Sequence, residues 1–325
     1  MLEQVLNYSS GPSPSRFNRQ LTEEEKRGLF LTHVKQRNPL IQEIVDENSH
    51  YRPIDQKVTQ ITRFLVNGIL FFPGFAIDIT VEDKEYLTEA SELANKTRKV
   101  MVMSNHQTDA DHPIKRAGLE HCGFGSFADR LVYLSGLNMI SRPYIAPFVG
   151  SENTLLIATP HELQLTIQYL EDPALDSSQK AELMQFQGLC RQLNDKSMRE
   201  MRRLMTYQGL IPAFYPEAGR SRDLQGRMTA IHPYMSSHFR RDGWIVPIVT
   251  WGPHETFPPE QTFKFQRFSV HMRVGKPFNS SELWREGANR KDPAEQAICG
   301  QRVYNKLISL NLALHNPDLP QTDES

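Results

Sequence analysis

The amino-acid sequence predicts an α/β fold, with a mixed central sheet flanked by helices and a small helical region before it. From Lys99 onward, short apolar runs alternate with longer stretches of helical periodicity, the pattern of strands and helices that share one sheet. The run at 268–274 alternates apolar and polar residues with period two, as a half-buried strand does. With 39% hydrophobic and 23% charged residues, the 325-residue chain is long enough for one large domain or two smaller ones.

The first ninety residues are expected to be mostly helical. Residues 9–16, rich in serine, glycine and proline, are typical of a flexible leader. Thr22 suits the N-cap of a helix with an acidic first turn, and Pro39–Glu47 predicts a second short helix with proline near its start. Helical spacing of apolar residues returns at 58–65 and 82–95. We therefore treat residues 1–92 as a leader and a helical accessory region.

The rest of the chain supplies the predicted sheet and its helices. Strands are expected at 100–103, 131–134, 154–158, 210–215, 245–250 and 268–274. A long helix is expected over 178–207, where Met198, Met201 and Met205 form one stripe that is typical of a helix face packed on a core. Residues 93–315 form the predicted main domain, and the polar residues 316–325 a disordered tail.

Charge and cysteine content narrow the classes of function. A formal net charge of -1 provides no overall basic field for nucleic acid, so any anion has to be bound by a local cluster. The three cysteines, Cys122, Cys190 and Cys299, are far apart and have no metal-ligand spacing. A disulfide framework is not expected, and a reducing compartment such as the cytoplasm or a plastid stroma fits best.

A membrane-spanning segment and a signal peptide are not expected. The most apolar stretch, residues 64–75, is shorter than the ~20 residues of a spanning helix and contains an asparagine and a proline. It can pack inside the protein or make shallow contact with a membrane surface. The first five residues lack the basic region of a signal peptide.

The most informative stretch is Asn105-His106-Gln107-Thr108-Asp109-Ala110-Asp111, which follows the first predicted strand. On a regular helix His106 and Asp111 would lie about 140° apart, so only a turn between them lets the two side chains meet. A carboxylate that accepts from one imidazole nitrogen leaves the other free to act as a general base. The same pattern also arises from a loop histidine beside an N-cap aspartate, and His106, Asp111 and His112 together offer a weaker metal-site alternative.

A second motif, Pro216-Glu217-Ala218-Gly219-Arg220-Ser221-Arg222, follows the predicted strand at 210–215. Two guanidinium groups beside the backbone N–H groups of a loop suit a phosphate, because each planar fork can bond two oxygens. A solvated charged loop would carry the same residues. No G-x-S-x-G elbow occurs in the chain, so the base is expected to act directly on a substrate hydroxyl.

Together, the N-H-x4-D string and the later P-E-x-G-R-S-R string resemble the glycerolipid acyltransferases, which acylate glycerol 3-phosphate or lysophosphatidate. The likeness runs from about residue 95 to 278, ends with Val274-Gly275-Lys276-Pro277, and is greatest to the soluble plastid-type enzymes that use acyl carrier protein. It implies that His106 is the base and Asp111 orients it. It also implies that Glu217, Gly219, Arg220 and Arg222 bind the acceptor, with His161 as a further contact.

The resemblance has departures. Thr159-Pro160-His161 stands where the plastid-type enzymes have a lysine–histidine pair, and Ser151-Glu152-Asn153 follows Gly150 where the second family motif usually carries arginine. The resemblance implies an acyl carrier protein or coenzyme A thioester as cosubstrate, a phosphorylated glycerol acceptor, no metal or other cofactor, and peripheral membrane contact at most. Alternatives of another class are a thioester hydrolase and a catalytically inactive lipid-binding protein.

Overall fold

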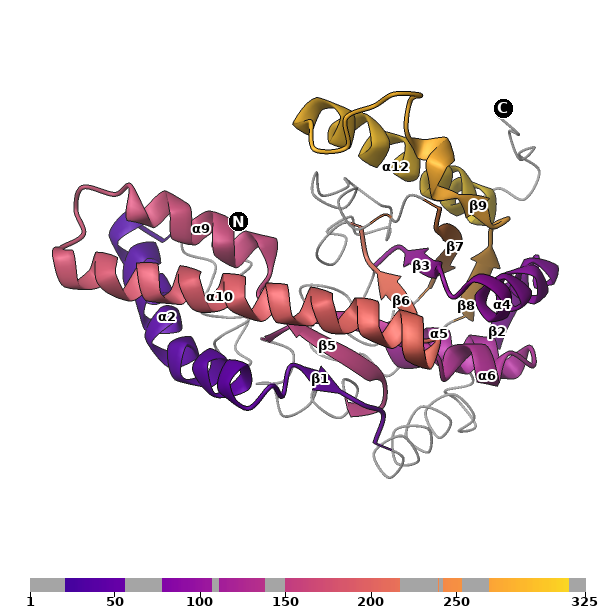
Figure 1. Ribbon diagram of the computed structural model, residues 1–325, viewed down its shortest axis with the longest axis horizontal. Coiled ribbons are helices and arrows are strands. Elements are labelled where there is room, and N and C mark those ends of the chain that lie inside the picture. The colour runs from indigo at the N-terminus through magenta and orange to yellow at the C-terminus, as the bar shows by residue number, and fades with distance from the viewer. Residues whose placement is uncertain are drawn as a thin grey trace.

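The computed structural model describes residues 21–55, 78–106, 111–137, 150–216, 239, 242–252 and 269–315, and its centre is a mixed sheet (Figure 1). Within these residues nine strands pair in the order β1-β5-β4-β6-β3-β7-β8-β2, with β9 beside β7. The strands are β1 (Tyr51–Arg52), β2 (Asp78–Glu82), β3 (Val100–Ser104), β4 (Leu131–Gly136), β5 (Asn153–Ile157), β6 (Ile211–Phe214), β7 (Trp244–Trp251), β8 (Ser269–Val274) and β9 (Phe278–Asn279). The predicted α/β class is confirmed.

The middle of the sheet is parallel. Strands β5, β4, β6, β3 and β7 run side by side in one direction, and the register places Met103 of β3 beside Phe214 of β6 and Pro247 of β7. Strand β1 is antiparallel to β5, strands β8 and β9 are antiparallel to β7, and β2 is parallel to β8. The central strands are covered on both faces, which explains why they appear in the sequence as continuous apolar runs.

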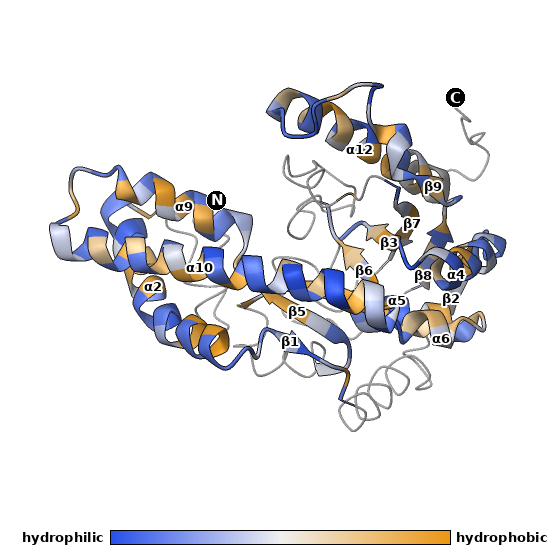
Figure 2. Ribbon diagram, viewed as in Figure 1, coloured by the Kyte–Doolittle hydropathy of each residue, from blue (hydrophilic) through white to orange (hydrophobic). Residues whose placement is uncertain are grey.

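Alternate residues of β3 point into two cores. Val100 and Val102 pack with α4 (Glu85–Thr97), α5 (Asp111–His121) and α6 (Gly125–Ala128). Met101 and Met103 pack on the other face with α12 (Pro293–His315) and with the last turns before β6. Figure 2 shows the sheet centre coloured mainly as apolar, whereas the helices around it alternate polar and apolar residues.

A helical lobe lies beside the sheet and is built from α2 (Glu23–Asp46), α9 (Pro160–Leu170) and α10 (Ser177–Arg203). The 27-residue α10 is about 40 Å long at 1.5 Å per residue and runs from this lobe to the sheet (Figure 1). It continues into one π-helical turn, Leu204–Gln208. Near the end of α9, the ring of Tyr169 stacks on Phe30 of α2 with centroids 5.1 Å apart. The lobe therefore has an apolar core of its own.

Most elements lie where the sequence predicts them. All six expected strands are present, the long helix is α10 with its π-helical turn, and Met201 and Met205 of the predicted stripe are buried. Thr22 caps α2 in a capping box with Glu25. The helix 82–95 is present as Glu85–Thr97.

One expectation was wrong. The separate helix predicted to start at Pro39 is the second half of α2, which continues through the proline because its buried face, from Phe30 to Val45, packs without a break. Tertiary packing offsets the lost backbone hydrogen bond there. The first ninety residues were expected to be mostly helical, and their described part contains α2 together with two short strands that no pattern predicted, β1 and β2, of which β2 pairs with β8.

Four expectations fall outside the described residues: the leader at 9–16, the helical pattern at 58–65, the apolar stretch at 64–75 and the tail at 316–325. In the part of the chain that is described, no helix has both the length and the apolar character needed to cross a membrane. The division between residues 92 and 93 stays a prediction. Strand β2, on its N-terminal side, belongs to the same sheet as β3.

Candidate active site

The His106 motif lies at the carboxyl edge of the central strands. Because β3 and β6 are parallel neighbours, the residues that follow them, His106 and Tyr215, emerge at the same edge of the sheet. This edge is where open α/β sheets place their ligand-binding groups. The order of strands therefore brings the starts of the two sequence motifs together.

Asn105 fixes the backbone immediately before His106. Its buried amide donates to the carbonyl of Thr250 at 2.7 Å and accepts from the Thr250 N–H at 2.9 Å. A side-chain amide that pairs with both groups of one residue holds the end of β3 to the end of β7. The position of the His106 backbone is thus set by hydrogen bonds from a neighbouring strand.

His106 and Asp111 are in contact, as predicted. The Nδ1 atom of the ring lies 2.9 Å from Oδ2 of Asp111, at the start of α5. The Asp111 side chain is 0% exposed and the His106 side chain is 14% exposed. An ionised carboxylate can only accept, so in the neutral ring the contact assigns the proton to Nδ1 and the lone pair to Nε2. The pair has the geometry of a general base with an orienting acid.

Aromatic rings support His106 from the sheet side. The Tyr215 ring stacks on the imidazole with centroids 4.3 Å apart, and the His112 ring lies 5.3 Å from Tyr215 and 3.9 Å from Tyr133. Burial is the largest cause that lowers the pKa of His112 well below its usual value, and the neighbouring His106 and Lys115 side chains lower it further. His112 is therefore a neutral ring packed against Tyr133 and Tyr215. Among the residues that the structure describes, no group of three or more His, Cys, Asp and Glu side chains is placed to hold a metal ion.

Sequence reasoning did not identify Tyr215, Tyr133 or Lys115 as part of this site. The sequence did contain a signal for Tyr215, because this residue comes directly after β6. His106 has a similar place, one residue further from the end of β3. Tyr133 and Lys115 gave no such signal. Lys115 is 3% exposed, and its ammonium donates to the Asn105 carbonyl at 3.1 Å and lies 3.6 Å from Asp111. These contacts depend on how α5 docks on the sheet.

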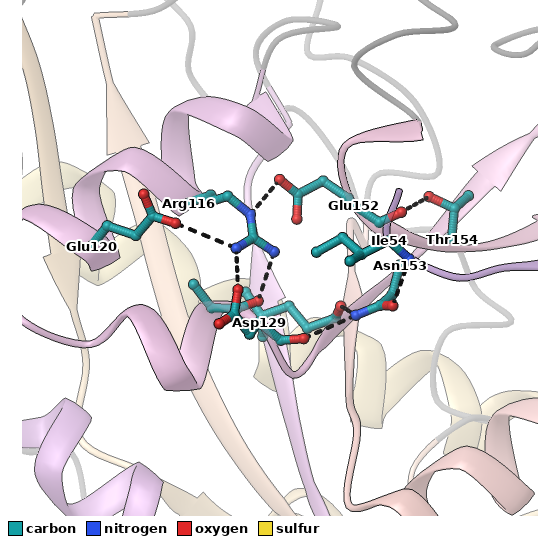
Figure 3. A network of polar contacts seen from close by, with 9 residues as sticks. Ile54, Arg116, Glu120, Asp129, Glu152, Asn153 and Thr154 are labelled. Atoms are coloured by element: carbon teal, nitrogen blue, oxygen red, sulfur yellow. Dashed lines mark hydrogen bonds and ion pairs between the residues drawn. The ribbon is translucent and has the colours of Figure 1, made fainter. Parts of the chain in front are cut away.

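A buried ion-pair network anchors α5 (Figure 3). Arg116 donates to Glu152 at 2.7 Å and to Asp129 at 2.6 Å, and a third carboxylate, Glu120, lies at 3.4 Å. Burial alone would lower the pKa of Arg116, but the hydrogen bonds and charges of Glu152 and Asp129 outweigh it and raise the pKa. Glu152, in the segment between Gly150 and β5, thus binds the helix that carries Asp111.

Asn153 extends this network to neighbouring segments (Figure 3). Its amide donates to the carbonyls of Asp129 and Leu131, at 2.9 and 3.2 Å, and its oxygen accepts from the Ile54 N–H. The start of β5, the end of α6, the start of β4 and the segment after β1 are thereby held together. The network therefore fixes the position of α5 against the sheet.

The remaining predicted site residues divide into two groups. His161 is the second residue of α9, after the Thr159 N-cap and Pro160. Helix α9 follows β5, so His161 lies at the same sheet edge as His106, but β5 is three strands away from β3. Glu217, Gly219, Arg220 and Arg222 lie outside the described residues, which stop at Pro216 on this side of the gap. Their role stays a prediction.

Comparison of the chain with protein-family models and with curated proteins finds no match. The case for a function therefore comes from the motif residues and from the geometry at the carboxyl edge of the sheet.

Proposed function

We propose that this chain is an O-acyltransferase that moves a fatty acyl group from an acyl thioester to a hydroxyl of glycerol 3-phosphate, with lysophosphatidate as the alternative acceptor. The observation that carries the proposal is the contact of His106 with Asp111 at 2.9 Å, in which a buried carboxylate orients a partly exposed imidazole. An imidazole that is oriented through Nδ1 can take a proton from a bound alcohol through Nε2.

The proposed step needs no covalent enzyme intermediate. Nε2 of His106 removes the hydroxyl proton of the acceptor while that oxygen attacks the thioester carbonyl. The carbon–sulfur bond then breaks, and the departing thiolate takes the proton from the imidazolium. Asp111 stabilises the positive charge that the ring carries between these two transfers. Histidine is thus returned to its neutral form at the end of each turnover.

The acceptor phosphate is proposed to bind the second motif. The Tyr215 ring contacts the imidazole of His106. In the sequence, Tyr215 is followed within seven residues by the rest of the motif, which includes Glu217, Gly219, Arg220 and Arg222. Two guanidinium groups on this segment would bind a phosphate ester and leave its hydroxyl for the base. His161, on the same sheet edge, is proposed as a further contact for the anion.

The test supplies purified protein with acyl carrier protein and coenzyme A thioesters, each with glycerol 3-phosphate and with lysophosphatidate, and identifies products by mass spectrometry. The wild-type chain is expected to form an ester with one of the acceptors. His106→Ala is expected to lower the rate by ~10²–10⁴-fold, the usual contribution of a general base, with little change in thermal stability. Near-normal turnover by this variant would reject His106 as the base.

The matched control is His121→Ala, which removes an exposed imidazole at the other end of α5 and is expected to leave the rate unchanged. Arg220→Ala is expected to raise the KM for the acceptor with little effect on the donor, and an unchanged acceptor KM would remove Arg220 from the site. Release of free fatty acid without ester would point to a thioester hydrolase. Lipid binding without any turnover would point to an inactive lipid-binding protein.

A further inference from the structure

Lys115 is a buried cation that the two sequence motifs do not include. It lies on α5 one turn after Asp111, and its side chain is 3% exposed. Its ammonium group lies 3.6 Å from Oδ2 of Asp111, donates to the Asn105 carbonyl at 3.1 Å and sits 4.6 Å from the centre of the Tyr215 ring. A lysine at such depth requires specific partners to offset its loss of hydration.

Each of these partners also holds His106. Asp111 accepts from its ring, Asn105 precedes it in the chain, and Tyr215 stacks on its face. We propose that Lys115 is the positioning residue of this site, which fixes Asp111, the Asn105 backbone and Tyr215 in the arrangement that holds the imidazole. The inference rests on the proposed function only in taking His106 to be the base.

The positive charge has a specific task at this position. A carboxylate that is 0% exposed is stable as an anion only with compensating charge, and Lys115 provides it 3.6 Å from Oδ2, the same oxygen that the His106 ring contacts. An anionic Asp111 enforces the Nδ1–H tautomer of His106 and leaves Nε2 unprotonated. The neighbouring His112 is neutral and gives no competing charge. Lys115 thus acts on the base through Asp111, without touching substrate.

The test reads the tautomer of His106 directly and needs no substrate. Two-bond ¹H–¹⁵N correlation spectra of protein labelled with ¹⁵N-histidine distinguish the two tautomers, and loss of one signal set in His106→Gln assigns the ring. Wild-type protein is expected to show the Nδ1–H form. Lys115→Met, which keeps the length of the side chain without its charge, is expected to show a mixture of both forms. Asp111→Asn and the double variant are expected to give the same spectrum as each other.

An unchanged His106 signal in Lys115→Met would overturn the proposal, as would a wild-type ring that already populates both tautomers. Leu183→Ala, in the core of the helical lobe, controls for destabilisation and is expected to leave the signal unchanged. In the acyl-transfer assay, Lys115→Met is expected to lower kcat by ~10²-fold with acceptor KM within about twofold, the effect of a misplaced base. If the wild-type chain transfers no acyl group but the spectra behave as expected, the proposed function fails and the positioning role stands.

Discussion

His112 follows Asp111 directly in the sequence, but the two side chains differ in charge at neutral pH. Burial is the largest cause that lowers the pKa of His112 well below 6.5, and only the charge of Asp111 opposes the shift. The folded protein therefore keeps this ring neutral at a pH where the unfolded chain protonates it. Since the unfolded state then binds more protons, the free energy of unfolding must fall as the pH drops below about 6.5.

This effect predicts the behaviour of His112→Phe, which keeps a ring against Tyr133 but cannot titrate. Between about pH 6.5 and the lowered pKa of the folded state, His112 contributes a slope of up to ~1.4 kcal/mol per pH unit. The variant is expected to lose stability less steeply than wild type when urea unfolding is measured from pH 7 to pH 5. The exposed His121→Asn serves as the control. Parallel stability curves for wild type and His112→Phe would show that the ring is protonated in the folded state.

Glu162 contributes in a different pH range. Burial alone would raise the pKa of Glu162, but hydrogen bonds from His33 and Thr159 and the charges of His33 and Arg37 lower it below 4.5. A carboxyl with a lowered pKa stabilises the fold above its unfolded value, and this contribution is lost as the pH falls below about 4.5. Acid unfolding is thus expected to begin with the His112 effect and to steepen later with that of Glu162.

Among the elements, α5 contributes the most side chains to the site and its anchor. These are Asp111, His112, Lys115 and Arg116. Its anchor is the buried pair of Arg116 and Glu152, whose side chains are 3% and 1% exposed. Replacing one partner of such a pair leaves an uncompensated buried charge. Glu152→Gln is expected to cost about 3–5 kcal/mol of unfolding free energy in urea denaturation.

Glu120→Gln is the matched control, because Glu120 faces the same guanidinium from the surface at 3.4 Å with 29% of its side chain exposed. Surface ion pairs contribute less than about 1 kcal/mol, so this change is expected to be small. Equal losses of unfolding free energy in the two variants would mean that the buried pair with Glu152 contributes no more to stability than the partly exposed pair with Glu120. A larger loss for Glu152→Gln would identify this pair as the anchor of α5.

An element could be predicted from the sequence when residues within that element determine its structure, and not when contacts with distant residues do. The run Val100–Met103 predicted β3 because a strand covered on both faces is apolar throughout. Asp78–Glu82 has only a short alternating pattern between charged ends, and its pairing with β8, almost two hundred residues away, has no local signal. Pro39 was misleading for the same reason, since the packing that carries α2 through it comes from α10 and α9.

The site divides in the same way. His106 and Asp111 were predictable because their spacing and the preceding strand are features of one short segment. Lys115 and Tyr133 were not, because they reach the site through the docking of α5 and the order of strands β4, β6 and β3. Residues that react belong to recognisable motifs, whereas residues that hold them are defined by tertiary contacts.

At the scale of the whole molecule, α10 links two hydrophobic cores. Its first half contributes Leu183, Phe186 and Leu189 to the core of the helical lobe, and Met201 near its end joins the core that contains Met101 and Met103 of β3. A helix of 27 residues that serves both cores couples them, since loss of one core removes the packing that stabilises half of the helix. The lobe and the sheet are therefore expected to unfold as one cooperative unit.

Phe30→Ala tests this coupling and, with it, the predicted division between residues 92 and 93. Phe30 is fully buried on α2 and stacks on Tyr169, so its truncation is expected to cost about 3–5 kcal/mol. If the cores are coupled, circular dichroism and the fluorescence of Trp244 and Trp251 in β7 will report one transition, shifted equally to lower urea concentration. Val102→Ala, in the sheet core, is the reciprocal variant and should shift both signals in the same way. An early loss of helical signal with unchanged tryptophan fluorescence would instead make α2 a separable accessory region, because the sheet would then be stable without the packing of the lobe.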